Sequence, residues 1–155
     1  MSLDERVRHD LYHAMKAGDK LRVSTLRLLS AALKNREIAK GAALEEAEAL
    51  EVVVVATKQR RETIKFAREH GREDIAQQEE HELAILETYL PEQLSSEEVC
   101  QRIETVVQEL GAISPQAIGL VMKVLMPTLK GQVDGSMVNR LVRERLARGA
   151  KGGAV

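Results

Sequence analysis

Apolar residues recur along most of this chain at steps of three and four, the spacing that places them on one face of an α-helix. The first such stretch follows Ser2 and Glu5, a capping-box pair, and runs up to Gly18. The second begins after Asp19, whose side chain suits an N-cap, and ends near Gly41. The pattern therefore predicts two helices at the start of the chain.

Two further helices are predicted, one from about Leu44 to His70 and one between Gly71 and Pro91. The first contains four successive valines, Val52 to Val55, which are also typical of a strand. The flanks of this run hold no turn residues and are rich in Glu, Ala and Lys, so a helix is favoured. The second helix has to end at Pro91, because the residue before a proline is pushed out of the α region.

Three short helices are predicted after Pro91. Ser95 and Glu98 form a second capping box, and the dipeptide 114–115, Ser-Pro, is a typical helix start. Asp134 is placed to cap the last helix. No strand is predicted anywhere.

The chain should therefore be all-α, with an N-terminal four-helix unit followed by a small three-helix C-terminal domain. We place the N-terminal helical bundle at residues 1–92 and the C-terminal helical domain at residues 93–150. Residues 151–155 are predicted to form a flexible tail.

Composition supports helix-on-helix packing and a reducing environment. Apolar residues make up 44% of the 155 residues and aromatic residues only 2%, so the core has to be built from aliphatic side chains. The single Cys100 excludes an internal disulfide. There is neither a signal peptide nor an apolar run of membrane-span length, so we expect a cytoplasmic protein without membrane contact.

The most informative segment is Gly119 to Val142, which reads GLVMKVLMPTLKGQVDGSMVNRLV. It predicts two short helices joined by a loop that contains Pro127, with a motif turn formed by Gly119, Gly131, Asp134 and Gly135. This segment resembles the C-terminal tail of the GatB/YqeY family. That family covers the B subunit of tRNA-dependent amidotransferases and small free-standing relatives. The resemblance extends through YLPEQLSSEE (Tyr89 to Glu98) and KQRRETIKF (Lys58 to Phe66), so the whole chain resembles a free-standing YqeY-like protein.

The resemblance implies an accessory role in tRNA metabolism. In the amidotransferase B subunit the homologous tail touches the outer body of the tRNA. Expected partners are therefore tRNA and components of an amidotransferase or an aminoacyl-tRNA synthetase. The family is associated with carbon–nitrogen ligase activity that uses glutamine as amido-N donor.

Residues for such catalysis are missing from this sequence. There is no glycine-rich phosphate loop, and neither Cys100 nor any serine lies in a nucleophile motif. His9 and His13 lie one helical turn apart, but no third metal ligand is evident near them. We therefore expect no catalytic residues, no cofactor and no metal site in this chain by itself.

Charge is distributed unevenly along the chain. Residues 112–155 carry seven basic and two acidic side chains, a net charge of +5, whereas residues 1–92 carry −3. Basic residues clustered on one helix face, beside a Lys-Gly loop, are typical of phosphate contacts. The alternative is a solvated face with favourable charges near a helix C-terminus. The candidate RNA-binding residues are Lys123, Lys130, Arg140, Arg143, Arg148 and Lys151.

A secondary basic stripe on the third helix consists of Lys58, Arg61, Lys65 and Arg68. Glu62 and Glu69 follow the two lysines by four residues, so ordinary stabilising pairs on an exposed helix are the stronger interpretation. No aromatic residues interleave with these charges, so RNA would be recognised by shape and phosphates rather than by base stacking. We expect no binding to DNA.

A structural ion pair is predicted between the third and fourth helices. Arg60 falls on the apolar side of the third helix, and Glu79 and Glu82 fall on the apolar side of the fourth. Buried charges have to be paired, so Arg60 should meet Glu79 or Glu82. A paired-carboxylate acid–base site is the functional alternative.

Three hypotheses follow. The first is an accessory module that binds tRNA, or a tRNA-processing assembly, through its basic C-terminal domain. The second is a helical protein–protein adaptor without RNA binding. The third is an amidotransferase component that is active only with partner subunits. A nearly neutral chain weakens the first hypothesis, and the missing catalytic residues weaken the third.

Overall fold

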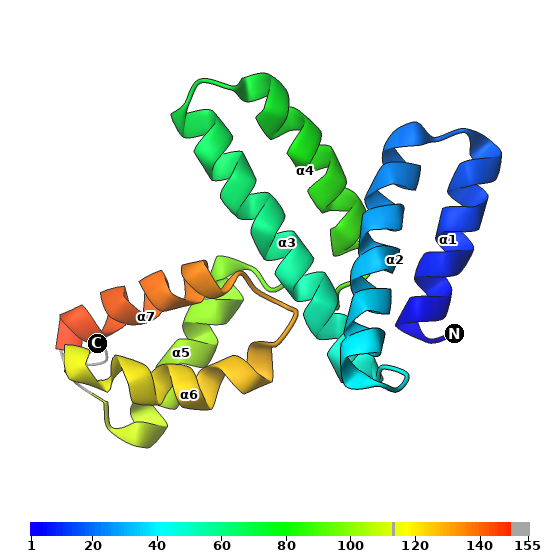
Figure 1. Ribbon diagram of the computed structural model, residues 1–155. Helices are drawn as coiled ribbons and strands as arrows, with labels where there is room; N and C mark the ends of the chain where they lie inside the picture. The colour runs from blue at the N-terminus through cyan, green and yellow to red at the C-terminus, as the bar shows by residue number, and fades with distance from the viewer. Residues whose placement is uncertain (113, 150–155) are drawn as a thin grey trace. The chain divides into compact units, whose positions relative to one another are not determined.

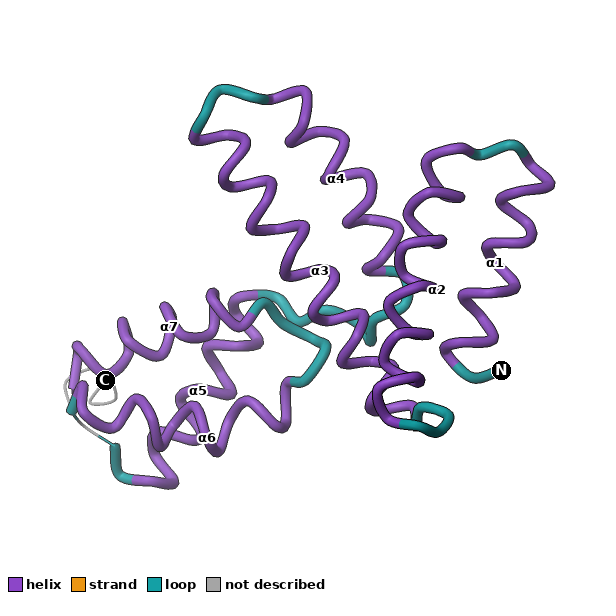
Figure 2. Tube along the Cα trace, viewed as in Figure 1, coloured by secondary structure: helices purple, strands orange, loops and turns teal. Residues whose placement is uncertain are grey.

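The structure is a computed structural model that describes residues 1–112 and 114–149. Within these ranges the chain contains helices and no strand, which confirms the predicted fold class (Figures 1 and 2). The predicted tail, residues 151–155, lies outside the described residues. The α-helices are α1 (Leu3–Ala17), α2 (Lys20–Lys40), α3 (Glu46–Glu69), α4 (Glu73–Glu87), α5 (Ser96–Leu110), α6 (Ile118–Leu129) and α7 (Gly135–Arg148), with a 3₁₀ turn at Pro115–Ala117 before α6.

Both predicted capping boxes are confirmed. The Ser2 hydroxyl accepts a hydrogen bond from the Glu5 amide at 3.2 Å, and the Glu5 carboxylate accepts one from the Ser2 amide at 3.0 Å. Ser95 and Glu98 repeat this arrangement at 3.2 and 2.9 Å. These bonds satisfy amides that have no partner inside the helix, so α1 and α5 begin where the local sequence predicts. The valine run, residues 52–55, lies inside α3 as expected.

Two helix ends differ from the prediction. Helix α4 ends at Glu87 rather than directly before Pro91, because its last turn tightens. There the Thr88 amide bonds to the Ile85 carbonyl and the Tyr89 amide to the Leu86 carbonyl, in the i to i+3 pattern of a 3₁₀ turn. Pro127, predicted in the loop, lies instead in the last turn of α6.

The position of Pro127 reflects packing. A proline removes one helical hydrogen bond and disfavours the preceding turn. Leu125 and Leu129, on either side of Pro127, are both buried in the core, and their burial holds this turn helical. The loop between α6 and α7 is therefore shorter than predicted, and Gly135 is already the first residue of α7.

Residues 1–91 form one compact unit of two helical hairpins, α1 with α2 and α3 with α4. Figure 1 shows the hairpins meeting where α2 approaches the first half of α3 and the end of α4. The main core of the unit lies there and contains Leu26, Leu33, Val53 and Leu86, all at most 1% exposed. Nearer the turn between α3 and α4, a smaller cluster is formed by Ile64, Ala67 and Ala76.

Residues 92–155 form the second unit, in which α5, α6 and α7 pack around a core of their own. Each helix contributes residues that are at most 1% exposed, such as Ile103 from α5, Leu125 from α6 and Leu146 from α7.

Candidate nucleic-acid interface

The loop between α6 and α7 is bound to the segment that precedes α5. The Gln93 side chain donates to the Gly131 carbonyl at 2.7 Å, and the Leu94 amide donates to the Gln132 carbonyl at 2.9 Å. The Gln132 side chain in turn donates to the Glu92 carbonyl at 3.4 Å. Two of the segments that carry the family resemblance, YLPEQLSSEE and the loop after α6, are thus joined by hydrogen bonds between residues 38 and 40 positions apart.

The residues of the predicted motif turn differ in what they do. Gly131 has a φ of 78°, the left-handed region that side chains rarely adopt, so this position requires glycine. At Gly119 a Cβ atom would meet nothing within 4 Å, and at Gly135 it would make an ordinary 3.8 Å contact with Met126. Asp134 caps α7, because its carboxylate accepts a hydrogen bond from the Ser136 amide at 3.1 Å. Gly131 and Asp134 therefore shape the loop.

The outer face of α7 carries three exposed arginines, Arg140, Arg143 and Arg148. They lie on the side opposite the buried residues of this helix. Arg140 is 3.7 Å from the Glu144 carboxylate, and Arg143 donates to the Asn139 side chain at 2.7 Å. Such surface contacts are weak, so they leave the positive charge of this face largely available to a partner. We name this set the α7 arginine face.

The remaining candidates for RNA contact are lysines. Lys123 on α6 and Lys130 at the end of α6 are both exposed. Lys151 lies outside the described residues. Among the candidate residues, the structure therefore leaves the α7 arginine face, Lys123 and Lys130 facing solvent, and Arg102 on α5 is a further exposed basic residue of this unit.

Arg145 has a different role, which the sequence interpretation missed. Its side chain is only 7% exposed and donates to both carboxylate oxygens of Glu104 on α5, at 2.5 and 3.1 Å. It also donates to the Gly149 carbonyl at 2.8 Å. The hydrogen bonds from Arg145 hold the pKa of the Glu104 carboxyl below its ordinary value. A sign of this role was present: position 145 follows Val138 and Val142 at helical spacing on the apolar side.

The secondary basic stripe on α3 is largely paired with α4. Arg61 donates to the Glu87 carboxylate at 3.2 Å, and Arg68 donates to Glu73 at 3.3 Å and also to Glu80. Lys58 and Lys65 are exposed. The two arginines thus bridge neighbouring helices, which supports the structural interpretation of this stripe rather than a phosphate-binding one.

Arg60 lies against both of its predicted partners. Its Nε atom is 3.2 Å from a Glu82 carboxylate oxygen and 3.4 Å from one of Glu79. These contacts lack hydrogen-bond alignment, and among the described residues neither Arg60 Nε nor Glu79 Oε2 has a hydrogen-bond partner. Burial raises the pKa of the Glu82 carboxyl, the nearby Glu79 charge raises it further, and Arg60 lowers it in part. One guanidinium therefore compensates two carboxylates incompletely.

This arrangement predicts a pH-dependent stability. The folded-state pKa of Glu82 lies above its ordinary value of 4.5, so the folded chain binds that proton more tightly than the unfolded chain. The free energy of unfolding should therefore fall as the pH rises from 4.5 through the folded-state pKa. Glu82→Gln, which imitates the protonated carboxyl, should remove this slope and be at least as stable as the parent protein at pH 7. Urea denaturation of both proteins between pH 4.5 and 7.5 measures the slope. A parallel pH profile in the two proteins would contradict the expectation.

Tyr89, the first residue of the YLPEQLSSEE motif, is a second contact that the sequence did not indicate. Its hydroxyl donates to the Asp10 carboxylate at 2.6 Å, and the Arg6 guanidinium lies 5.3 Å from the ring centroid. Burial raises the pKa of the Tyr89 phenol, and the hydrogen bond to Asp10 adds to this effect. Tyr89, two residues after the end of α4, therefore links this part of the chain to α1 through Asp10 and Arg6.

The described residues contain no cluster of side chains that could hold a metal ion. His9 and His13 are neighbours, with 3.1 Å between their Nε2 atoms, but no group of three or more metal-ligating side chains occurs in residues 1–112 and 114–149. Cys100 is exposed.

No single described helix is long and apolar enough to cross a membrane. Only as a pair, bent by 104°, do α5 and Pro115–Leu129 have the length and composition of a membrane span.

Comparison with known proteins gives a consistent picture. A model of the family described as Yqey-like protein matches residues 4–146. Three similar curated proteins carry the name "Altered inheritance of mitochondria protein 41, mitochondrial". The one from Kluyveromyces lactis is 33% identical, over 84% of this chain and 73% of its own length. Those from Vanderwaltozyma polyspora and Lachancea thermotolerans are 32% and 31% identical, over 67% and 70% of this chain. The chain spans 58% and 60% of the length of these last two proteins.

Proposed function

The chain belongs to the YqeY-like family, and we propose that it is a non-catalytic accessory protein that binds tRNA through the α7 arginine face. The observation that supports this most is the arrangement of Arg140, Arg143 and Arg148, which are exposed on one side of α7 while its other side is buried. Guanidinium groups match phosphate geometry and bind it bidentately. Lys130, which is exposed at the start of the loop that leads to α7, is a further candidate for phosphate contact.

The charge of the unit sets the strength of such binding. Residues 92–155 hold eight basic and seven acidic side chains, a net charge of +1, because α5 is acidic. The pairing of Arg145 with Glu104 further reduces the charge available to a partner. Binding therefore relies on a local basic face rather than on overall attraction, and it should be weak and sensitive to salt.

The salt dependence of tRNA binding tests this proposal. Neutralising about three or four phosphates should give a log–log slope of about −3 for the binding constant against salt concentration. Replacing Arg140, Arg143 and Arg148 together by alanine should reduce that slope to near zero and weaken binding at low salt by about tenfold or more. Fluorescence anisotropy of labelled tRNA at several salt concentrations measures both quantities.

Two controls complete this experiment. The double variant Lys58→Ala with Lys65→Ala removes exposed charges from α3 in the other unit and should leave the slope unchanged. Circular dichroism of each variant establishes that its helices are intact. Absence of tRNA binding at the lowest salt, or an α7 triple variant that binds as well as the parent protein, would refute the RNA proposal.

The family's association with amidotransferases extends the proposal to partners. In this view the chain presents tRNA to an amidotransferase or aminoacyl-tRNA synthetase component without catalysing amide transfer. A protein–protein adaptor is the second candidate function. This function is favoured by a groove with basic lining residues between α1 and α2, which shares no residue with the α7 arginine face.

A further inference from the structure

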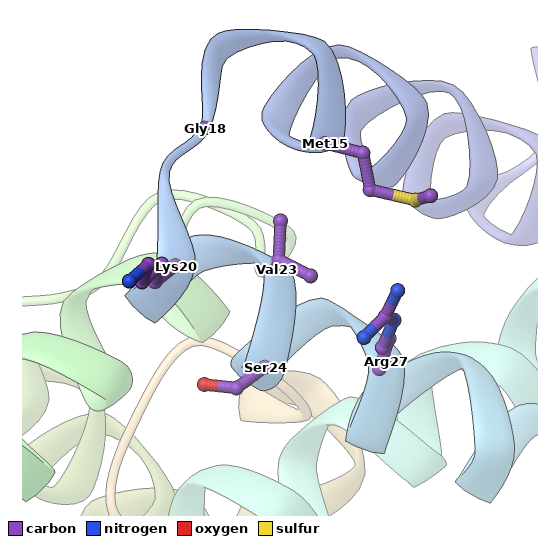
Figure 3. Close-up of a pocket in the computed structure, with 6 residues that line it drawn as sticks. All are labelled: Met15, Gly18, Lys20, Val23, Ser24 and Arg27. Atoms are coloured by element: carbon purple, nitrogen blue, oxygen red, sulfur yellow. The ribbon is translucent and has the colours of Figure 1, made fainter.

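An open groove of about 420 Å³ lies where α1 ends and α2 begins. Figure 3 shows Met15 on α1, with Val23 and Arg27 projecting toward it from α2. Gly18 in the connecting turn, Lys20 and Ser24 complete the lining. The apolar part of the groove is therefore formed by Met15 and Val23, and its polar edge by α2.

The groove continues into exposed apolar surface on α1. Met15 is 50% exposed, and Tyr12, almost one turn earlier, is 54% exposed. The Lys16 ammonium lies 4.5 Å from the centroid of the Tyr12 ring, so this aromatic surface carries a cation as well. Large apolar side chains left in solvent beside a groove are typical of a surface that another molecule covers.

Every charged residue that lines the groove is basic. Lys20 and Arg27 lie seven residues apart, on one face of α2, and both are exposed. Within the described ranges, neither side chain forms an ion pair. Arg22 and Lys34, which are also on α2, do have acidic neighbours: Arg22 contacts Asp19 at 3.5 Å and Lys34 contacts Glu37 at 3.7 Å. The positive charge is thus uncompensated at the groove itself.

We propose that this groove, defined by Met15, Val23, Lys20 and Arg27, docks an acidic amphipathic segment of a protein partner. One apolar side chain of the segment would enter between Met15 and Val23, and its carboxylates would face Lys20 and Arg27. The positive charges of Lys20 and Arg27 favour an acidic segment, and the apolar wall of Met15 and Val23 favours a segment that also carries an apolar side chain.

Other kinds of occupant fit the groove less well. Sites for small molecules bury most of the ligand surface, whereas this groove is open along one side. RNA would gain from Lys20 and Arg27, and one base would find a stacking face on Tyr12, but the wall formed by Met15 and Val23 would stay uncovered because it offers no aromatic face. Methionine is well suited to apolar peptide side chains because its thioether adapts to irregular shapes.

A displayed library of random peptides, each long enough for about four helical turns, provides the test. Selection against the full-length protein should enrich peptides with apolar residues at helical spacing and with excess Asp and Glu. Titration of a labelled enriched peptide should show binding weakened by about tenfold or more with Arg27→Glu. The exposed residue Lys58 on α3 offers a matched control, and Lys58→Glu should change the affinity less than about twofold, because Lys58 does not line the groove and an exposed charge is screened by salt.

A second variant separates the apolar contact from the charge. Met15→Gln keeps the length of the side chain and should weaken the selected peptide, while its circular dichroism remains that of the parent protein. Enrichment of basic peptides, no enrichment at all, or peptides that bind Arg27→Glu as well as the parent would overturn the proposal. The proposal would also be overturned if Arg27→Glu kept its peptide binding but lost binding to tRNA or to anionic vesicles. That result would assign the groove to another class of partner.

Discussion

Replacing Arg60 by alanine should lower the free energy of unfolding by about 3–5 kcal/mol at pH 7, the range for breaking a buried ion pair. Two carboxylates lie within 3.4 Å of Arg60 Nε, and the side chains of Glu79 and Glu82 are 19% and 9% exposed. Without Arg60 both lose their compensating charge in a site that water reaches poorly. Arg60 lies on α3 between the residues of the main core and those of the smaller cluster. Its loss should therefore destabilise the packing of α3 on α4 on both sides of this position.

The effect of Arg60→Ala should depend on pH. Arg60 lowers the pKa of Glu82, so removing it raises that pKa further and lets a carboxyl take up a proton in the folded state. The loss of stability should therefore grow as the pH rises from 4.5. Hydrogen exchange of the α3 and α4 amides in the full-length chain measures the loss locally, which avoids assuming a two-state transition for two units.

A matched control and a partner test accompany this variant. Lys58→Ala, on the exposed side of the same helix, should change stability by less than about 0.5 kcal/mol. A double-mutant cycle of Arg60→Ala with Glu82→Gln should show a coupling energy well above the error of the measurement. Equal and small effects of Arg60→Ala and Lys58→Ala would mean that Arg60 is solvated. Intact stability together with lost RNA or peptide binding would mean that Arg60 belongs to a functional site.

Replacing Arg145 by alanine should destabilise the C-terminal unit by about 3 kcal/mol or more. Arg145 is almost fully buried, and its loss removes two hydrogen bonds to Glu104, one to the Gly149 carbonyl and the packing of its aliphatic stem. A unit of this size buries a modest fraction of its surface, so such a loss is a large part of its stability. We expect the amides of α5 and α7 to lose protection from hydrogen exchange while those of residues 1–91 keep it.

The pH dependence of this second pair has the opposite sign. The pKa of Glu104 is lowered in the folded state, so the pair stabilises the protein above pH 4.5 and loses that effect as the pH falls through the folded-state pKa. The difference between the parent protein and Arg145→Ala should therefore shrink under acid conditions. Arg143→Ala, two residues away on the exposed side, is the control and should cost less than about 1 kcal/mol. A loss of exchange protection equal to that of Arg143→Ala would refute a buried role for Arg145.

The local sequence determined where most helices begin and end. A capping box spans four residues and a single N-cap needs one, so Ser2, Ser95 and Asp134 could be recognised without knowledge of the fold. The helical pattern also placed Arg60, Glu79 and Glu82 on apolar faces, since side-chain direction on a helix follows from spacing. The family resemblance, too, depended on short local motifs.

The tertiary structure decided which charges are available to a partner. Arg145 and Glu104 are 41 residues apart, and only the packing of α7 on α5 makes one arginine of the last helix structural while Arg140, Arg143 and Arg148 face solvent. Likewise Arg61 is engaged by Glu87 and Tyr89 by Asp10 across helices. Such pairs depend on the rotation and separation of packed helices, which periodicity alone does not specify. Pro127 shows the same principle, because burial of Leu125 and Leu129 outweighs the local tendency of proline to end the helix.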